Sequence, residues 1–294
     1  MLLSITAAAG PGLADATELG FLLHKHPDRA HRFDLPVGTA HVVFPTAGPQ
    51  RCTVCLLLEV DPIALVRGKR SAPEGFTLGQ YVNDRPYAAS SLLAVALGRV
   101  FRTALSGRCT ARPDLPDVAL DLTVEVPALP SAGGVALVRR LFAPLGWQVQ
   151  ATPLPLEEWG ESRYVDLTLT GSVTLAAALS HLYVLLPVLD GAKHYWVGAD
   201  EVDKLIRTAG GWLGGHPERE LITRRYLAHQ RSYVTDAVDR LAALDDAPSV
   251  PGGGELEAPE AEDEAVPTPL VHQRRAAVLA ELHRAGAHRV VDLG

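Results

Sequence analysis

The sequence predicts an α/β or α+β fold in which helices cover a mixed sheet, followed by a flexible acidic linker and the start of a second domain. Three observations support this prediction. Short apolar or alternating runs typical of strands are interspersed with runs of helical spacing. Hydrophobic residues make up 47% of the 294 residues and charged residues 21%, which excludes a wholly disordered or fibrous chain. An acidic stretch rich in proline and glycine interrupts the C-terminal part.

The first third of the chain contains three predicted strands and one long helix. Residues 1–7 and 38–45 form short apolar runs of strand character. Residues 51–60 (RCTVCLLLEV) are almost all apolar, which predicts a strand buried on both faces. Residues 87–104 carry apolar side chains at helical spacing, and Asp84 is the expected N-cap of that helix.

The following part of the chain predicts more strands and helices. Residues 119–127 alternate apolar and polar side chains, which is typical of a half-buried strand, and further strands are expected at 147–151 and 164–170. The apolar run 173–189 contains His181 and is shorter than the ~20 residues of a membrane span, so we expect a buried core helix and no membrane contact. Helices are expected at residues 134–145, 173–186, 200–207 and 217–244.

Residues 244–268 divide the chain. They hold eight acids, four prolines and no base, a composition that cannot bury enough apolar area to become ordered, so they predict a flexible linker. The net charge of the chain is −7, but the residues outside this linker carry +1, so global charge neither favours nor excludes an RNA partner. We therefore expect an interaction module at residues 1–243 and the first helix and strand of a truncated doubly wound domain at residues 269–294.

The cysteines and histidines indicate no metal or redox site. Cys52, Cys55 and Cys109 are too few for a disulfide scaffold and fit a reducing compartment, so a cytoplasmic location is expected. Cys52 and Cys55 lie within an apolar strand, which favours buried structural cysteines over a zinc or redox pair. His24 and His26 have no cysteine or acid at a familiar ligand spacing. No nucleophile elbow, phosphate-binding loop or zinc-protease helix is found, so no catalytic residue is assigned.

Basic and aromatic residues occur together near the ends of predicted elements. Aromatic rings beside Arg or Lys can stack on bases and hold phosphates, although the same residues also serve as ordinary amphipathic packing. The candidate contacts to RNA or to a protein partner are Lys193, Tyr195, Trp196, Arg224 and Arg225.

Six stretches together resemble one family. The chain is similar to the N-terminal half of the bacterial RNA 3′-terminal ribose 2′-O-methyltransferase, which acts in RNA repair with a bacterial polynucleotide kinase-phosphatase-ligase. The final VVDLG resembles the first strand of its methyltransferase domain. The stretches are LHKHP (23–27), QYVNDRPYAASS (80–91), SRYVDLTL (162–169), SHLYVLLPVLD (180–190), KHYWV (193–197) and HPERELITRRYLAH (216–229).

The resemblance implies a division of labour. The N-terminal half is expected to bind the kinase-phosphatase-ligase and activate its ligase on broken RNA ends such as those of tRNA, with no DNA partner. Methyl transfer, with S-adenosylmethionine and a divalent metal, belongs to the C-terminal half. Asp292 and Gly294 match the start of the turn that binds S-adenosylmethionine, but the rest of that turn is not in this sequence. The chain is therefore expected to hold no cofactor and no methyltransferase activity of its own.

Two other functions stay open at this point. One is an RNA-binding platform that uses the basic and aromatic residues named above. The other is an RNA-end-processing enzyme with a site around His24, His26, Asp84 and Arg85.

Overall fold

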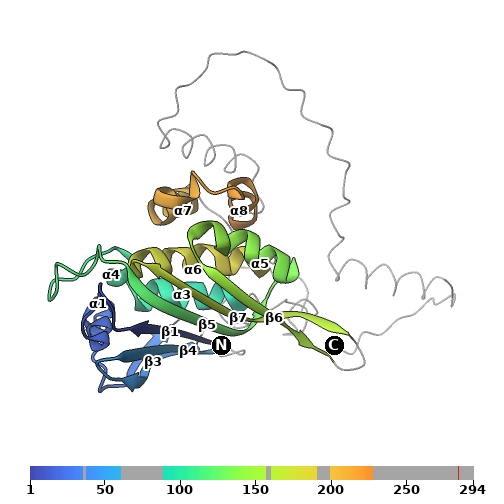
Figure 1. Ribbon diagram of the computed structural model, residues 1–294. Helices are drawn as coiled ribbons and strands as arrows, with labels where there is room; N and C mark the ends of the chain where they lie inside the picture. The colour runs from blue at the N-terminus through green and yellow to red at the C-terminus, as the bar shows by residue number, and fades with distance from the viewer. Residues whose placement is uncertain (36–37, 61–88, 157–159, 191–198, 228–283, 285–294) are drawn as a thin grey trace, which may run out of the picture. The chain divides into compact units, whose positions relative to one another are not determined.

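β1 (Leu2–Ala8) is the central strand of a seven-stranded sheet with the order β2-β3-β4-β1-β5-β7-β6 (Figure 1). The computed structural model describes residues 1–35, 38–60, 89–156, 160–190, 199–227 and 284. The other strands are β2 (His31–Leu35), β3 (Gly38–Ala47), β4 (Arg51–Val60), β5 (Leu120–Pro130), β6 (Gln148–Pro155) and β7 (Glu161–Val173). All strands expected before residue 171 are present, and β2 is an addition.

Neighbouring strands in the described sheet run antiparallel in every pair. The predicted class, a sheet covered by helices, is confirmed, and α+β is the more fitting of its two names. The alternation of strands and helices predicts a mixed sheet, whereas the described strands pair only in the antiparallel sense. Because β1 lies between β4 and β5, the long connection from β4 to β5 joins two parallel strands that are not neighbours.

The helices pack mainly on one face of the sheet. Figure 1 shows α3, α5 and α6 lying across the same side of the strands. Fourteen of the sixteen residues of α6 are buried, which confirms the predicted core helix. None of the described helices is long and apolar enough to cross a bilayer. The helices are η1 (Ala16–Glu18), α1 (Leu19–Leu23), α3 (Ala89–Val100), α4 (Arg102–Leu105), α5 (Gly134–Phe142), η4 (Ala143–Leu145), α6 (Leu175–Asp190), α7 (Ala199–Leu213) and α8 (Arg219–Tyr226).

β4 has the bounds that the sequence predicts, but the expectation that both of its faces are buried is wrong. Cys52, Val54 and Leu56 are almost inaccessible, whereas Leu57, on the opposite face, is 44% exposed. The reason is that side chains alternate between the two faces of a strand, and the helices pack on only one of them.

The face away from these helices carries mostly small polar side chains. Thr6 and Thr53 face each other there, with their hydroxyl oxygens 2.9 Å apart, and Ser4 donates a hydrogen bond of 3.0 Å to Glu125 of β5. These cross-strand pairs join β1 to both of its neighbours on the side opposite the hydrophobic core.

Candidate functional site

The C-terminal end of α6 brings together several of the stretches that the sequence singles out. Ser90, near the start of α3, donates a hydrogen bond of 2.8 Å from Oγ to Oδ2 of Asp190, the last residue of α6. Ser90 is 0% and Asp190 5% exposed. Polar groups this deeply buried depend on their partners, so the pair fixes the start of α3 against the end of α6.

The last carbonyl groups of α6 accept hydrogen bonds from two further segments of the chain. Arg225 of α8 donates from Nη1 to the carbonyl oxygen of Val188, at 3.1 Å. The backbone N–H of Ala132 donates to the carbonyl oxygen of Leu189, at 2.8 Å. The backbone N–H of Ser131 donates to the carbonyl oxygen of Arg163, also at 2.8 Å. Residues of four of the six stretches therefore meet around the C-terminal end of α6. These stretches are far apart in the sequence, so the sequence alone does not predict that they meet.

A chain of indole and imidazole rings joins α6 to α7. The indole N–H of Trp147 donates to Nδ1 of His181, at 3.1 Å, and the ring of His181 lies edge-on to Trp212, with centroids 5.1 Å apart. The indole N–H of Trp212 donates to Oγ of Ser180, at 2.8 Å, and this hydroxyl donates to the carbonyl oxygen of Thr208, at 2.6 Å. Because Nδ1 of His181 accepts, the ring is neutral with its proton on Nε2.

His216 extends this chain toward α5 and α8. Its Nε2 donates to the carbonyl oxygen of Leu141, at 3.0 Å, and its Nδ1 accepts from the amide of Glu218, also at 3.0 Å. Burial lowers the pKa of His181 to about 4, with a smaller contribution from His216. Burial also lowers the pKa of His216. Burial therefore keeps both histidines neutral, and the hydrogen bonds named above hold their rings in place.

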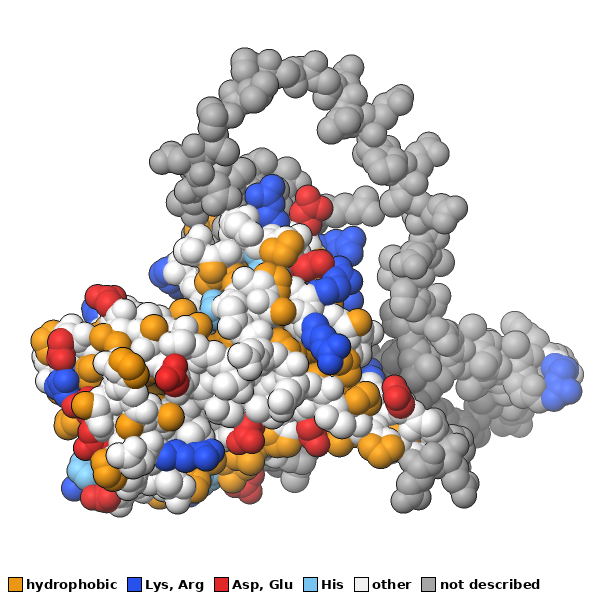
Figure 2. Space-filling view, viewed as in Figure 1, with side chains coloured by type: hydrophobic (Ala, Val, Ile, Leu, Met, Phe, Trp, Pro, Cys, Tyr) orange, Lys and Arg blue, Asp and Glu red, His pale blue; other side chains and the backbone are white. Residues whose placement is uncertain are grey.

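Five arginines of α5 and α8 form what we call the arginine surface: Arg139, Arg140, Arg219, Arg224 and Arg225. Arg140 holds Glu218 through two parallel hydrogen bonds of 2.8 and 2.7 Å, and this pair ties the end of α5 to the start of α8. The hydrogen bond from Arg140 lowers the pKa of Glu218. Figure 2 shows Lys and Arg side chains gathered over α5 and beside α8.

The predicted contact residues fall into two groups. Arg224 is exposed on α8, and Arg225 lies partly buried beside it, with its guanidinium bound to α6 as described above. Both belong to the arginine surface. The predicted contacts Lys193, Tyr195 and Trp196 lie outside the described residues. So do Asp292 and Gly294, and both domain boundaries, at residues 243 and 268.

The histidines of the alternative enzyme site make hydrogen bonds to backbone groups. Nε2 of His24 lies 3.0 Å from the carbonyl oxygen of Arg108, and Nδ1 of His26 accepts from the amide of Asp28, at 3.2 Å. The other two residues of that site, Asp84 and Arg85, lie outside the described residues. In the part of the chain that the structure covers, no three His, Cys, Asp or Glu side chains are grouped as a metal site.

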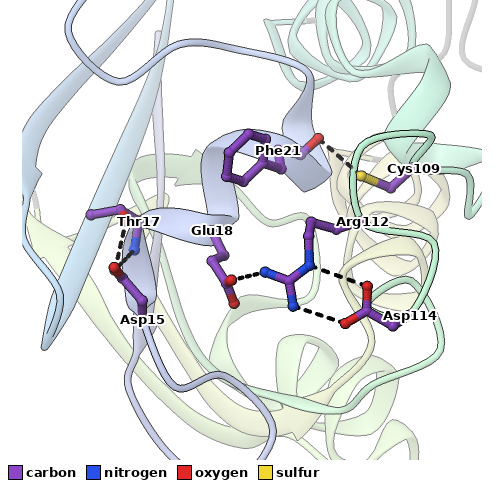
Figure 3. A network of polar contacts seen from close by, with 7 residues as sticks. All are labelled: Asp15, Thr17, Glu18, Phe21, Cys109, Arg112 and Asp114. Atoms are coloured by element: carbon purple, nitrogen blue, oxygen red, sulfur yellow. Dashed lines mark hydrogen bonds and ion pairs between the residues drawn. The ribbon is translucent and has the colours of Figure 1, made fainter.

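A second polar cluster fastens the segment before β5 to α1 (Figure 3). Arg112 forms an ion pair with Glu18 and a bidentate pair with Asp114, at 3.1 and 2.8 Å. Sγ of Cys109 lies 3.4 Å from the carbonyl oxygen of Phe21. The cluster links only residues of η1, α1 and the adjoining loop, which is the arrangement of a structural brace.

The three cysteines are free thiols. Cys52 is buried among the core residues, and burial, together with Asp15, raises its pKa to about 11. Cys55 lies three residues further along β4 and therefore points to the opposite face. The two thiols therefore point away from each other, which does not suit a shared metal ion or a disulfide. The prediction of buried cysteines is confirmed for Cys52, whereas Cys55 is only partly buried.

The six stretches belong to a region of the chain that matches a known protein family. A family model described as the RNA repair, ligase-Pnkp-associating region of Hen1 matches residues 1–242. The chain belongs to this family. The resemblance drawn from the six stretches is therefore confirmed for the Hen1 region, which the description of the family connects with RNA repair.

Among solved structures, a chain of a Pnkp1/Rnl/Hen1 RNA repair complex is similar, with 14% sequence identity and a TM-score of 0.49. The similarity covers 83% of this chain and 56% of that one, so this chain spans little more than half of its solved relative. No curated protein matches the sequence.

Proposed function

We propose that the chain docks on the ligase of a bacterial polynucleotide kinase-phosphatase-ligase and activates it during RNA repair. The observation that supports this proposal is the match of residues 1–242 to a family described by its association with ligase and Pnkp. In this proposal, 2′-O-methylation of RNA 3′ ends, with S-adenosylmethionine and a divalent metal, belongs to a C-terminal domain that starts at residues 269–294. Asp292 and Gly294 then contribute to its cofactor-binding turn. The free thiols fit a reducing compartment, so we propose a cytoplasmic location.

The docking face that we propose is the sheet face away from α3, α5 and α6. Three apolar side chains of this face are exposed, whereas its small polar residues Ser4 and Thr6 are buried: Leu2 and Val43 are each 37% exposed, and Leu57 is 44% exposed. Leu2 is the cross-strand partner of Leu57, and Val43 lies two residues from His41, the other partner of Leu57. We call this group the apolar row. Contiguous exposed apolar residues with a polar rim are typical of the core of a protein interface.

Substitution of the apolar row tests the docking. The measurement is binding of the purified chain to the kinase-phosphatase-ligase by biolayer interferometry. Leu57→Asp should weaken binding about tenfold or more, because it places a charge at the centre of a desolvated interface. Leu156→Asp is the matched control, since Leu156 is 50% exposed near the end of β6, at the far edge of the same sheet. Unchanged binding by Leu57→Asp would place the contact elsewhere on the chain.

Activation requires a separate measurement. Ligation of a nicked RNA by the partner enzyme is followed with and without the chain, and stimulation should be lost by Leu57→Asp in proportion to the lost binding. A chain that binds the partner but never changes its ligation rate would refute activation and leave the docking intact.

A further inference from the structure

The arginine surface has no part in the docking face proposed above, because α5 and α8 lie on the helical side of the sheet. The helical segments of α5 and α8 contain five arginines and a single acid, Glu220, with Glu218 as the residue before α8. This surplus of positive charge is larger than the net charge of +1 that all residues outside 244–268 carry together. It is therefore a local feature that composition alone does not explain.

Two of the arginines are held in place by hydrogen bonds to other parts of the protein. Arg140 is fixed by its two hydrogen bonds to Glu218, and Arg225 by its hydrogen bond to the carbonyl oxygen of Val188. In the described part of the chain no acidic side chain is paired with Arg139 or Arg224, and both are exposed. Arg139 and Arg224 are thus available to a ligand, and each is next in sequence to an arginine that is already anchored, which lowers the entropic cost of binding an anion.

Like charges remain uncompensated within this surface. The pKa of Arg225 is lowered by burial and by the nearby Arg224 and Arg140. The favourable position of arginines in the last turn of a helix accounts for Arg139 and Arg140 on α5 and for Arg224 and Arg225 on α8, each pair considered alone. It does not account for the closeness of Arg140 and Arg225, which lie on different helices and repel each other; an anion bound between them would relieve this repulsion.

The side chains around the arginines favour a nucleic acid over a protein as the anionic ligand. The exposed large hydrophobic residues of the described structure lie on other elements: Leu2, Phe21, Val43, Leu57, Val95, Leu156 and Tyr164. A protein interface needs apolar anchors at its centre, whereas nucleic-acid interfaces are polar and strongly positive. Guanidinium groups match phosphate oxygens in a bidentate geometry, and Arg139 and Arg224 supply two such forks.

We propose that the arginine surface of α5 and α8 binds the phosphate backbone of RNA without reading its sequence. This surface is distinct from the apolar row, so the inference does not depend on the docking proposal. It gives the chain two separate contacts, one for a protein and one for the RNA strand.

The test is fluorescence anisotropy of the full chain with a labelled 20-nucleotide RNA at several salt concentrations. Arg139→Gln combined with Arg224→Gln should weaken binding about tenfold and lower the slope of log affinity against log salt by about 1.5, the value expected for two lost contacts to single-stranded phosphates. The matched control combines Arg51→Gln with Arg102→Gln, which removes the same charge from exposed positions on β4 and α4 and should change affinity less than twofold.

Two outcomes would overturn the proposal. One is no binding of RNA by the wild-type chain at 50 mM salt. The other is an equal loss of affinity in the two double variants, which would mean that only net charge matters. Thermal midpoints of both variants exclude unfolding as the cause. Binding of Leu57→Asp to the same RNA, expected to be unchanged, separates a failure of this proposal from a failure of docking.

Discussion

Ser90 and Asp190 join the start of α3 to the end of α6 through a buried hydrogen bond of 2.8 Å. Ser90→Ala leaves the buried carboxyl group with one donor fewer, so the free energy of unfolding should fall by about 1–3 kcal/mol. Urea denaturation measures this change. In a double-mutant cycle with Asp190→Asn, the two losses should be less than additive. Fully additive losses would show that the pair is not coupled.

Gly98 of α3 lies directly against Tyr183 of α6. A Cβ atom at Gly98 would lie 2.6 Å from Cε2 of Tyr183, a buried ring of α6. Gly98→Ala should therefore destabilise the protein by about 1–3 kcal/mol through overpacking.

Gly211 of α7 provides the matched control for this substitution. A Cβ atom there would meet nothing within 4 Å. Gly211→Ala should accordingly stabilise the protein by about 0.5–1 kcal/mol through helix propensity. Thermal unfolding of both variants compares the two signs, and a stabilising Gly98→Ala would contradict the packing of α3 on α6.

Acid should destabilise the fold through His181. Its pKa is lowered to about 4 in the folded state, against 6.5 in the unfolded chain, so the unfolded chain binds the proton first as the pH falls. The stabilisation is complete above pH 6.5 and is lost progressively between 6.5 and 4, by about 3 kcal/mol in all. The measurement is the free energy of unfolding in urea at pH 7, 6 and 5.

His181→Gln separates this effect from the titration of the carboxylates. Glutamine retains an acceptor for the indole N–H of Trp147 but cannot be protonated, so the variant should lose most of the slope between pH 6.5 and 5. The same pH dependence in wild type and variant would assign the acid sensitivity to other groups.

Thr223 of α8 is fully buried, and its hydroxyl has no hydrogen-bond partner among the described residues. Thr223→Val replaces that hydroxyl by a methyl group of similar size, so the protein should become more stable by about 1 kcal/mol. Thr223→Ala should instead destabilise it, because it leaves a cavity. Differential scanning calorimetry decides, and a lower melting temperature for the valine variant would show that the hydroxyl is in fact bound.

The core helix and the strands other than β2 were predictable because their signals are local. Residues 51–60 and 119–127 show their strand character in their own composition, and their observed limits differ from the predicted ones by three residues at most. α1 was missed because it is short and ends at His24, whose φ of 55° lies in the left-handed region. Glycine or asparagine is the usual residue at such an end, so the common stop signal is absent from the sequence.

The candidate site was predictable only in part, since its contacts join distant segments. Arg224 and Arg225 could be predicted as contact residues because basic and aromatic residues surround them in the sequence. Arg139 and Arg140 could not, because nothing in the sequence reveals that α5 lies beside α8. The bidentate pair between Arg140 and Glu218 spans 78 residues. Such a contact is a property of the fold rather than of any segment.

The position of β1 in the middle of the sheet has a consequence for folding. Ser4 of β1 meets Glu125 of β5 across 121 residues of chain. One edge of β1 therefore stays unpaired until this long loop closes, and pairings between such distant segments favour slow folding. Loss of β1 would also separate β2, β3 and β4 from β5, β6 and β7, because no other strand of the described sheet bridges these two groups.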